Sequence, residues 1–325
     1  MPLLKSEFRP AWWLPGPHAQ TLWPTLFRRG PRIALQSERM ELPDGDFLDL
    51  CWSGPAGAPM VLLLHGLEGS IHSHYARGIM AELNRHGLRA CLMHFRGCSG
   101  EPNRLPTAYH SGKSDDPAWL IDHLWERGDR AVAAVGVSLG GNVLLKLLGE
   151  QGEQTRLSCA AALSVPFVLH DSARRLRQGL SRLYERHLIG RLQQSFERKC
   201  AHMPCPIQVN VRELKTFHAF DDRVTAPLHG FAGVHDYYSR CASRQFIPRI
   251  RVPTLILHAE DDPFMFPDTV PTAEELPACV TLELSPHGGH MGFLSGRVPG
   301  RPIYWAERRL AKWIAGRIER SSDRG

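Results

Sequence analysis

A serine framed by two glycines is the clearest chemical feature of the sequence. The stretch Gly136-Val-Ser-Leu-Gly140 follows an apolar run at 131–135, and apolar residues at helical spacing continue to position 148. A serine at the apex of a tight strand-to-helix turn needs glycines two positions away on each side, because a Cβ there would collide with the backbone. The pattern predicts a nucleophile elbow, with Ser138 as the nucleophile. The backbone N–H of Leu139, at a helix start, is the expected donor to an oxyanion.

An acid and a base are needed beside this serine, because a hydroxyl is a poor nucleophile at neutral pH. Three adjacent acids, Glu260, Asp261 and Asp262, follow the apolar run 252–258. We choose Asp262, since a residue directly before proline favours an extended conformation, which points it away from the strand end. Asp261 is the alternative.

Two histidines follow the next apolar run, in Pro286-His-Gly-Gly-His290. His290 is the expected base, because Gly288 and Gly289 give it a flexible approach, and His287 is the alternative. The chain order serine, aspartate, histidine is that of the α/β-hydrolase fold.

A second oxyanion donor is expected in the loop that starts at His65, after the apolar run 59–65. Gly66 allows close approach of the backbone to a substrate, and α/β-hydrolases supply a donor from this place. The N–H of Leu67 is the candidate. A simple turn at Gly66 is the alternative.

Other residues suggest competing chemistry. His110 and Asp115 have an H-x4-D spacing reminiscent of acyltransferase motifs, although a structural role near the site is favoured for His110. His287 and His290 could suggest a metal, but zinc needs three or four ligands, and neither H-E-x-x-H nor a cysteine cluster accompanies them. We expect no metal and no cofactor.

Strand-like and helix-like stretches alternate along the chain, which is typical of a parallel sheet with right-handed crossovers. The expected fold is a single α/β-hydrolase domain over residues 1–325, with a mostly parallel central sheet flanked by helices. Strands are expected at 59–65, 88–94, 131–135, 157–165, 252–258 and 279–284, with a hairpin at 39–52. Helices are expected at 75–85, 116–127, 138–148 and 301–318.

Residues 167–250 interrupt the alternation and predict a helical lid inserted above the carboxyl edge of the sheet. Leucines recur there at helical spacing, among many arginines. The leucines are Leu176, Leu180, Leu183, Leu188 and Leu192, and the arginines are Arg174, Arg175, Arg177, Arg182, Arg186 and Arg191. We expect these arginines to lie on a face exposed to solvent. The alternative is that they attract anionic lipid.

Residues 1–30 are rich in Trp, Pro and Arg and show no clear period. We expect an ordered N-terminal arm whose aromatic rings cover the domain, because large apolar rings seldom stay exposed. Its His18 is expected to be packed and hydrogen-bonded.

Composition excludes several classes of protein. The formal net charge is +6 with a pI near 9.0, but the basic residues are dispersed among acids, so we expect no nucleic-acid partner. No stretch nears the eighteen apolar residues of a membrane span, and the N-terminus carries charges where a secretion signal would need its apolar region, so we expect neither. Cys51, Cys91 and Cys159 lie in apolar runs without a C-x-x-C pair, which favours a reducing, cytoplasmic location. The oligomeric state is not indicated.

Several segments together resemble the YheT-like branch of the α/β-hydrolases, esterases related to the animal abhydrolase proteins that act on lipids. The resemblance runs from His18-Ala-Gln-Thr21 to the final helix and includes 65–70, 95–104, 109–112, 136–142, 220–227 and 288–293. It implies hydrolysis of a carboxylic ester without a cofactor, by a charge-relay system of Ser138, Asp262 and His290.

The sequence therefore predicts a serine carboxylesterase that acts on a small-molecule ester through an acyl-enzyme. Two alternatives stay open. The first is an acyltransferase that uses the same residues, or His110 and Asp115. The second is a non-catalytic binding protein of this fold.

Overall fold

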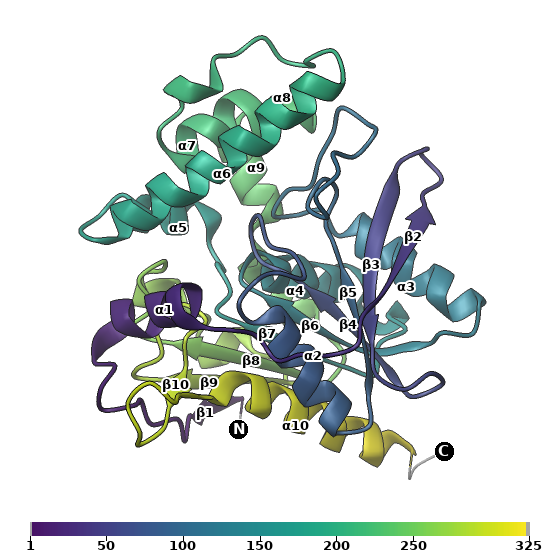
Figure 1. The fold of residues 1–325 in the computed structure, drawn as a ribbon, viewed down its shortest axis with the longest axis vertical. Coiled ribbons are helices and arrows are strands. Elements are labelled where there is room, and N and C mark those ends of the chain that lie inside the picture. Colours follow the sequence, from purple (N-terminus) through teal and green to yellow (C-terminus); the bar gives the residue numbers. More distant parts are fainter. Residues whose placement is uncertain (1, 323–325) are drawn as a thin grey trace.

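The computed structural model describes residues 2–322, and its core is a nine-stranded sheet (Figure 1). The strand order is β1-β9-β8-β7-β6-β4-β5-β3-β2. Neighbours from β1 across to β5 are parallel, whereas β3 and β2 are antiparallel at the other edge. The strands are β1 (Leu3–Lys5), β2 (Gln36–Glu41), β3 (Phe47–Ser53), β4 (Met60–Leu64), β5 (Arg89–Met93), β6 (Ala131–Val137), β7 (Cys159–Leu163), β8 (Thr254–Ala259) and β9 (Val280–Ser285).

The central strands are apolar because helices cover both faces of the sheet. Every residue of β4 and β7 is buried, as a strand covered on both faces requires. On one face lie α2 (Ala76–Arg85) and α10 (Trp305–Ser322), and on the other lie α3 (Asp115–Glu126) and α4 (Leu139–Gln151). The predicted mostly parallel sheet flanked by helices is confirmed.

Between β7 and β8 the chain leaves the sheet and forms an insertion of five α-helices, which lies above the sheet in Figure 1. These are α5 (Leu169–Leu176), α6 (Ser181–His202), α7 (Phe217–Phe220), α8 (Ala226–Leu228) and α9 (Val234–Cys241). The leucines at helical spacing were expected to share one apolar helix face. This prediction is wrong for Leu180 and Leu183, which are 60% and 65% exposed. A break at Gly179, with φ of 51°, separates α5 from α6, so one continuous face cannot form.

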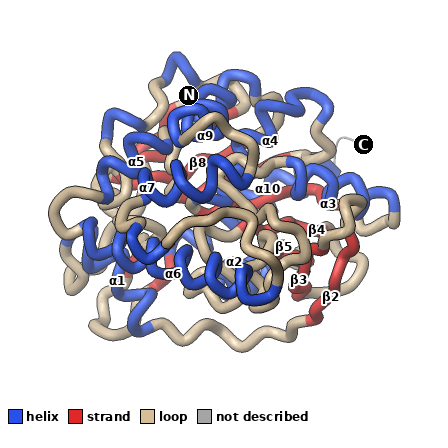
Figure 2. The backbone as a smooth tube through the Cα atoms, turned by 90° about the horizontal axis from the view of Figure 1, so that it is seen from above, coloured by secondary structure: helices blue, strands red, loops and turns tan. Residues whose placement is uncertain are grey.

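The N-terminal arm is more regular than expected. Strand β1 pairs with β9, and α1 (Gly16–Phe27) lies beside the start of α6 in the view from above (Figure 2). The buried residues of α1 are Gln20, Thr21 and Pro24. Because this buried face is largely polar, no apolar period marks the helix. The expectation that the rings cover the domain is wrong for Trp12, which is 71% exposed.

Two further details differ from expectation. The last helix begins at Trp305 rather than near 301, because Ile303–Tyr304 forms strand β11 and pairs with β10 (Leu294–Ser295). A disulfide joins Cys200 to Cys205, a pair that the sequence analysis did not single out, whereas Cys51, Cys91 and Cys159 are free and buried. Within residues 2–322, no helix has the length and apolar character needed to cross a bilayer.

Candidate active site

The turn between β6 and α4 holds Ser138 in an unusual backbone conformation. Its φ is 52°, a left-handed value that is costly for a residue with a Cβ. The flanking glycines leave no room for a side chain: a Cβ on Gly136 would lie 2.5 Å from the carbonyl oxygen of Gly140, and one on Gly140 would lie 2.4 Å from that of Leu64. Backbone crowding therefore accounts for both glycines.

Three side chains from distant parts of the chain meet at this turn. Nε2 of His290 lies 3.0 Å from Oγ of Ser138, and Nδ1 of His290 lies 2.8 Å from Oδ2 of Asp262. The other oxygen of Asp262 accepts the N–H of Phe264 at 2.8 Å. Asp262 and His290 are buried, whereas Ser138 is half-buried. The structure thus brings together the hydroxyl, imidazole and carboxylate that the sequence analysis selected.

The competing residues are placed elsewhere. Asp261 accepts the N–H of Gly289 at 2.9 Å and lies 3.4 Å from Nδ1 of the exposed His287. Asp115 pairs with Lys113 at 2.6 Å.

His110 lines the same cavity as Ser138. Its Nδ1 accepts the N–H of Gly112 at 3.1 Å, and no hydrogen bond joins it to Asp115 in the described part of the chain. The two residues therefore do not form the acid–base pair that the H-x4-D spacing suggested.

The two candidate oxyanion donors both border the cavity above Ser138. On either side of Leu67, the N–H of Gly66 donates to Tyr75 Oη and the N–H of Glu68 donates to Tyr109 Oη, each at 2.7 Å. Among residues 2–322, neither Leu67 N–H nor Leu139 N–H has a hydrogen-bond acceptor. Two such N–H groups are suited to bind developing negative charge.

Helix α1 supports His290, which the sequence analysis did not predict. Oγ1 of Thr21 accepts the backbone N–H of His290 at 2.9 Å and donates to the carbonyl of Pro17 at 2.7 Å. A Cβ on Gly289 would lie 2.4 Å from that same carbonyl oxygen. The expected reason for this glycine, a flexible approach, is therefore wrong, because close packing against α1 excludes a side chain. In the sequence, the one indication that this part of the N-terminal arm matters was that the family resemblance includes residues 18–21.

Aromatic contacts fix two further side chains. The ring of Phe264 stacks on the imidazole of His290 at 3.9 Å between centroids, with 4° between the planes. This contact restricts the imidazole plane. His18 is packed and hydrogen-bonded as expected, with Nδ1 2.9 Å from Oη of Tyr184 on α6.

The loop that carries Leu67 is held by the insertion. Glu68 has a φ of 51° and is buried. Its carboxylate accepts hydrogen bonds from Tyr109 and Ser195, and its carbonyl accepts one from Arg191 at 2.8 Å. Because Arg191 and Ser195 belong to α6, the seating of this helix determines the position of the residue next to Leu67.

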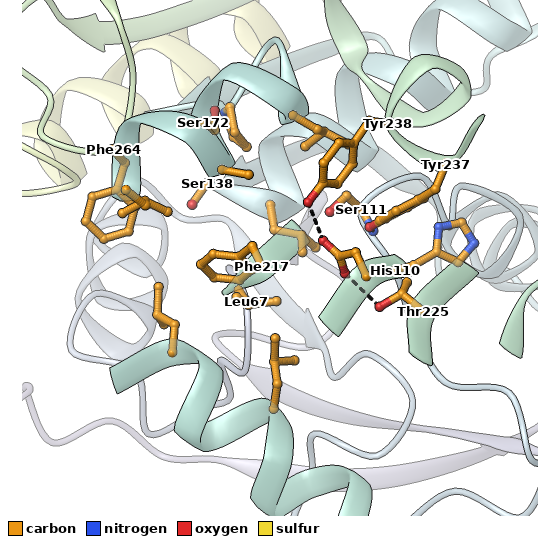
Figure 3. A pocket seen from close by; sticks show the side chains of 18 of the residues that line it. Leu67, His110, Ser111, Ser138, Ser172, Phe217, Thr225, Tyr237, Tyr238 and Phe264 are labelled. Atoms are coloured by element: carbon orange, nitrogen blue, oxygen red, sulfur yellow. Dashed lines mark hydrogen bonds between the residues drawn. The ribbon is translucent and has the colours of Figure 1, made fainter. Parts of the chain in front are cut away.

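A cavity lies between Ser138 and the insertion (Figure 3), and its empty space, including the part that is open to solvent, is about 790 Å³. Leucine and aromatic side chains from both parts of the chain form most of its wall, and they include Leu67, Leu139, Leu169, Leu176, Leu188, Leu192, Phe217 and Phe264. An apolar cavity beside a nucleophile is suited to an acyl chain. No group of three or more metal-ligating side chains occurs within residues 2–322.

Acid is expected to destabilise the protein through His65. Nδ1 of His65 donates to the carbonyl of Gly66 at 2.7 Å, and Nε2 accepts the N–H of Phe95 at 3.0 Å. Burial lowers the pKa of His65 from 6.5 to about 3. Below pH 6.5 the imidazole of His65 is therefore protonated in the unfolded chain but stays neutral in the folded chain. The free energy of unfolding is unaffected by this group above pH 6.5 and decreases as the pH falls toward 3. The loss is on the order of a few kcal/mol.

Urea unfolding at pH 7.5 and pH 5 measures this effect. The difference in unfolding free energy between the two pH values should be smaller in His65→Gln than in the original protein. Other buried histidines, such as His258, keep their own pH dependence in both proteins. An equal difference in the two proteins would contradict the assignment to His65.

The strained serine turn at the carboxyl edge of a mostly parallel sheet defines the protein as an α/β-hydrolase. Residues 59–297 match the family described as alpha/beta hydrolase fold, and the chain belongs to this family. It is 42% identical to "Putative esterase YheT" of Escherichia coli (strain K12), over 98% of this chain and 95% of that protein. It is 28% identical to "Phospholipase ABHD3" of Mus musculus, over 98% of this chain and 80% of that protein. The resemblance to YheT-like proteins is confirmed.

A solved structure supports the fold. The esterase Pf2001 of Pyrococcus furiosus superimposes with a TM-score of 0.56 at 15% identity, over 90% of this chain and 99% of that chain. The α/β-hydrolase fold expected from the sequence is thereby confirmed.

Proposed function

We propose that the protein is a serine carboxylesterase that hydrolyses carboxylic esters, including lipid esters, through an acyl-enzyme. The observation that carries the proposal is the series of contacts from Ser138 to His290 to Asp262, at 3.0 and 2.8 Å. The apolar cavity above Ser138 supports an acyl substrate. The names of the two relatives, an esterase and a phospholipase, agree with hydrolysis of an ester bond.

In the proposed mechanism, His290 Nε2 takes the proton of Ser138 as Oγ attacks the ester carbonyl. The N–H groups of Leu67 and Leu139 stabilise the negative oxygen of the tetrahedral intermediate. The intermediate collapses, and His290 returns the proton to the departing alcohol. Water then attacks the acyl-enzyme with His290 as base, which releases the carboxylic acid and restores Ser138. Asp262 holds the imidazole in the tautomer that accepts the proton. No step requires a cofactor.

Labelling with a fluorophosphonate tests this proposal, because the reagent reacts with an activated serine. We expect the purified protein to carry the label on the peptide that contains Ser138, and the Ser138→Ala protein to remain unlabelled. A folded protein that stays unlabelled would instead favour the non-catalytic alternative. Acyl transfer by the same residues predicts a different product, since an added alcohol would receive the acyl group in place of water.

We also propose that the insertion is a lid whose outer corner contacts anionic lipid. Leu180 and Leu183 are exposed between Arg177, Arg182 and Arg186, which are exposed as well. Exposed apolar side chains among cations suit the surface of a charged bilayer. We expect cosedimentation with phosphatidylglycerol vesicles, weaker cosedimentation with phosphatidylcholine vesicles, and a loss of binding in the Leu180→Asp, Leu183→Asp double variant. Equal sedimentation of the variant would contradict this contact. A cytoplasmic location stays a prediction.

A further inference from the structure

A buried carboxylate interrupts the apolar wall of the cavity. Asp221 is 9% exposed and lines the same cavity as Ser138. Its Oδ2 accepts the hydroxyl of Tyr238 and its Oδ1 accepts the hydroxyl of Thr225, each at 2.7 Å (dashed lines in Figure 3). Within residues 2–322, no lysine, arginine or histidine pairs with it, and burial raises its pKa to about 6. The cavity therefore contains an acid without a counter-charge.

This carboxylate has unused capacity for hydrogen bonds. Two carboxylate oxygens together offer about four acceptor positions, and the hydroxyls of Tyr238 and Thr225 occupy one on each oxygen. A purely apolar acyl chain would leave the other positions of Asp221 without a donor. A ligand group that donates a hydrogen bond would satisfy them.

A second polar side chain in the cavity lacks any partner. Ser172, on α5, is 8% exposed and lines the cavity, as Figure 3 shows. In the described part of the chain, its Oγ has no hydrogen-bond partner. Buried hydroxyls are nearly always paired, because an unpaired one forfeits its hydration without compensation. The unpaired Oγ of Ser172 is thus a second polar position in the wall of this cavity that lacks a partner.

We propose that Asp221 and Ser172 make this part of the cavity a polar subsite, in which each can bond a hydroxyl group of the substrate, so that the enzyme prefers esters with a free hydroxyl over apolar esters of equal length. A hydroxyl suits each residue, because it can donate to the carboxylate of Asp221 or accept from Ser172. An ammonium group cannot accept a hydrogen bond. A site built to pair with a substrate hydroxyl discriminates strongly against the analogue that lacks it. The inference rests on the proposed esterase function and names its substrate class.

The hydroxyl can lie on either half of the ester, and two pairs of substrates distinguish these sources. In the first pair, glycerol monohexanoate and propyl hexanoate, the hydroxyl lies on the alcohol half of the ester. In the second pair, the p-nitrophenyl esters of 6-hydroxyhexanoic acid and hexanoic acid, the hydroxyl lies on the acyl chain. We expect kcat/KM to favour the hydroxylated ester by about tenfold or more in one of the pairs, as loss of a hydrogen bond to a charged group implies.

Variants assign the preference to the subsite. Ser172→Ala removes a hydroxyl that bonds to no other described residue, so it should fold normally and reduce the preference by roughly three- to tenfold. Asp221→Asn should reduce it further. Ser239→Ala, an exposed hydroxyl of the insertion outside the cavity, is the matched control and should leave the preference unchanged.

Several results would overturn the subsite. They are equal kcat/KM within both substrate pairs, or a preference that Ser172→Ala leaves unchanged. If Asp221→Asn does not fold, the Ser172→Ala result decides. Hydrolysis of none of the four esters, together with absent fluorophosphonate labelling, would contradict the proposed function itself, and with it the subsite. A labelled enzyme that ignores the hydroxyl contradicts the subsite alone.

Discussion

Replacing Ser138 with alanine is expected to lower kcat for p-nitrophenyl butyrate by about 10⁴- to 10⁶-fold. The variant lacks the oxygen that forms the acyl-enzyme, while the oxyanion donors and the cavity stay in place. The fold should be retained, because the hydroxyl of Ser138 contacts His290 at the cavity surface rather than the core. Initial rates at saturating substrate, with circular dichroism to verify folding, measure the effect.

A matched serine variant separates this effect from general damage. Ser99 is half-buried in a neighbouring loop and is absent from the cavity wall. We expect Ser99→Ala to keep kcat within a few-fold of the original protein. A Ser138→Ala protein that hydrolyses the ester at the original rate would end the proposed mechanism.

Asp262→Asn is expected to lower kcat by about 10⁴-fold with little change in KM. The carboxylate lies 2.8 Å from Nδ1 of His290 and keeps the proton on that nitrogen. An asparagine amide can donate to Nδ1 instead, which places the imidazole proton on Nε2. That nitrogen faces Ser138 and could then no longer accept its proton.

The neighbouring acid provides the control. Asp261 accepts a backbone N–H from Gly289, and the amide oxygen of asparagine can accept the same bond. We therefore expect Asp261→Asn to change kcat only a few-fold. A larger loss in Asp261→Asn than in Asp262→Asn would transfer the role of the acid to Asp261.

Local patterns were sufficient to predict the sheet apart from its edge strand β1, and to predict the three residues that meet at its carboxyl edge. The glycines around Ser138 mark a crowded turn, and the position of Asp262 before proline marks a strand end. Parallel strands place their carboxyl ends at one edge, so residues 152 positions apart, such as Ser138 and His290, become neighbours.

The supporting contacts could not be predicted in this way. Thr21 holds the backbone of His290, but it lies on a helix whose buried face is largely polar and therefore shows no apolar period. The bond from Arg191 to Glu68 joins residues 123 positions apart, and neither end carries a local pattern. Such contacts arise from tertiary packing, which a single sequence does not reveal.

The contact from Thr21 to His290 also indicates which part of the chain the function needs. The family match starts at residue 59, yet Thr21, which supports the proposed base His290, belongs to the first thirty residues. A chain shortened to the matched region would retain Ser138, Asp262 and His290 but would lose the contact from Thr21 that supports the backbone of His290. We therefore expect the functional protein to need residues that precede the family match. Deletion of the first thirty residues should lower turnover although Ser138, Asp262 and His290 are still present.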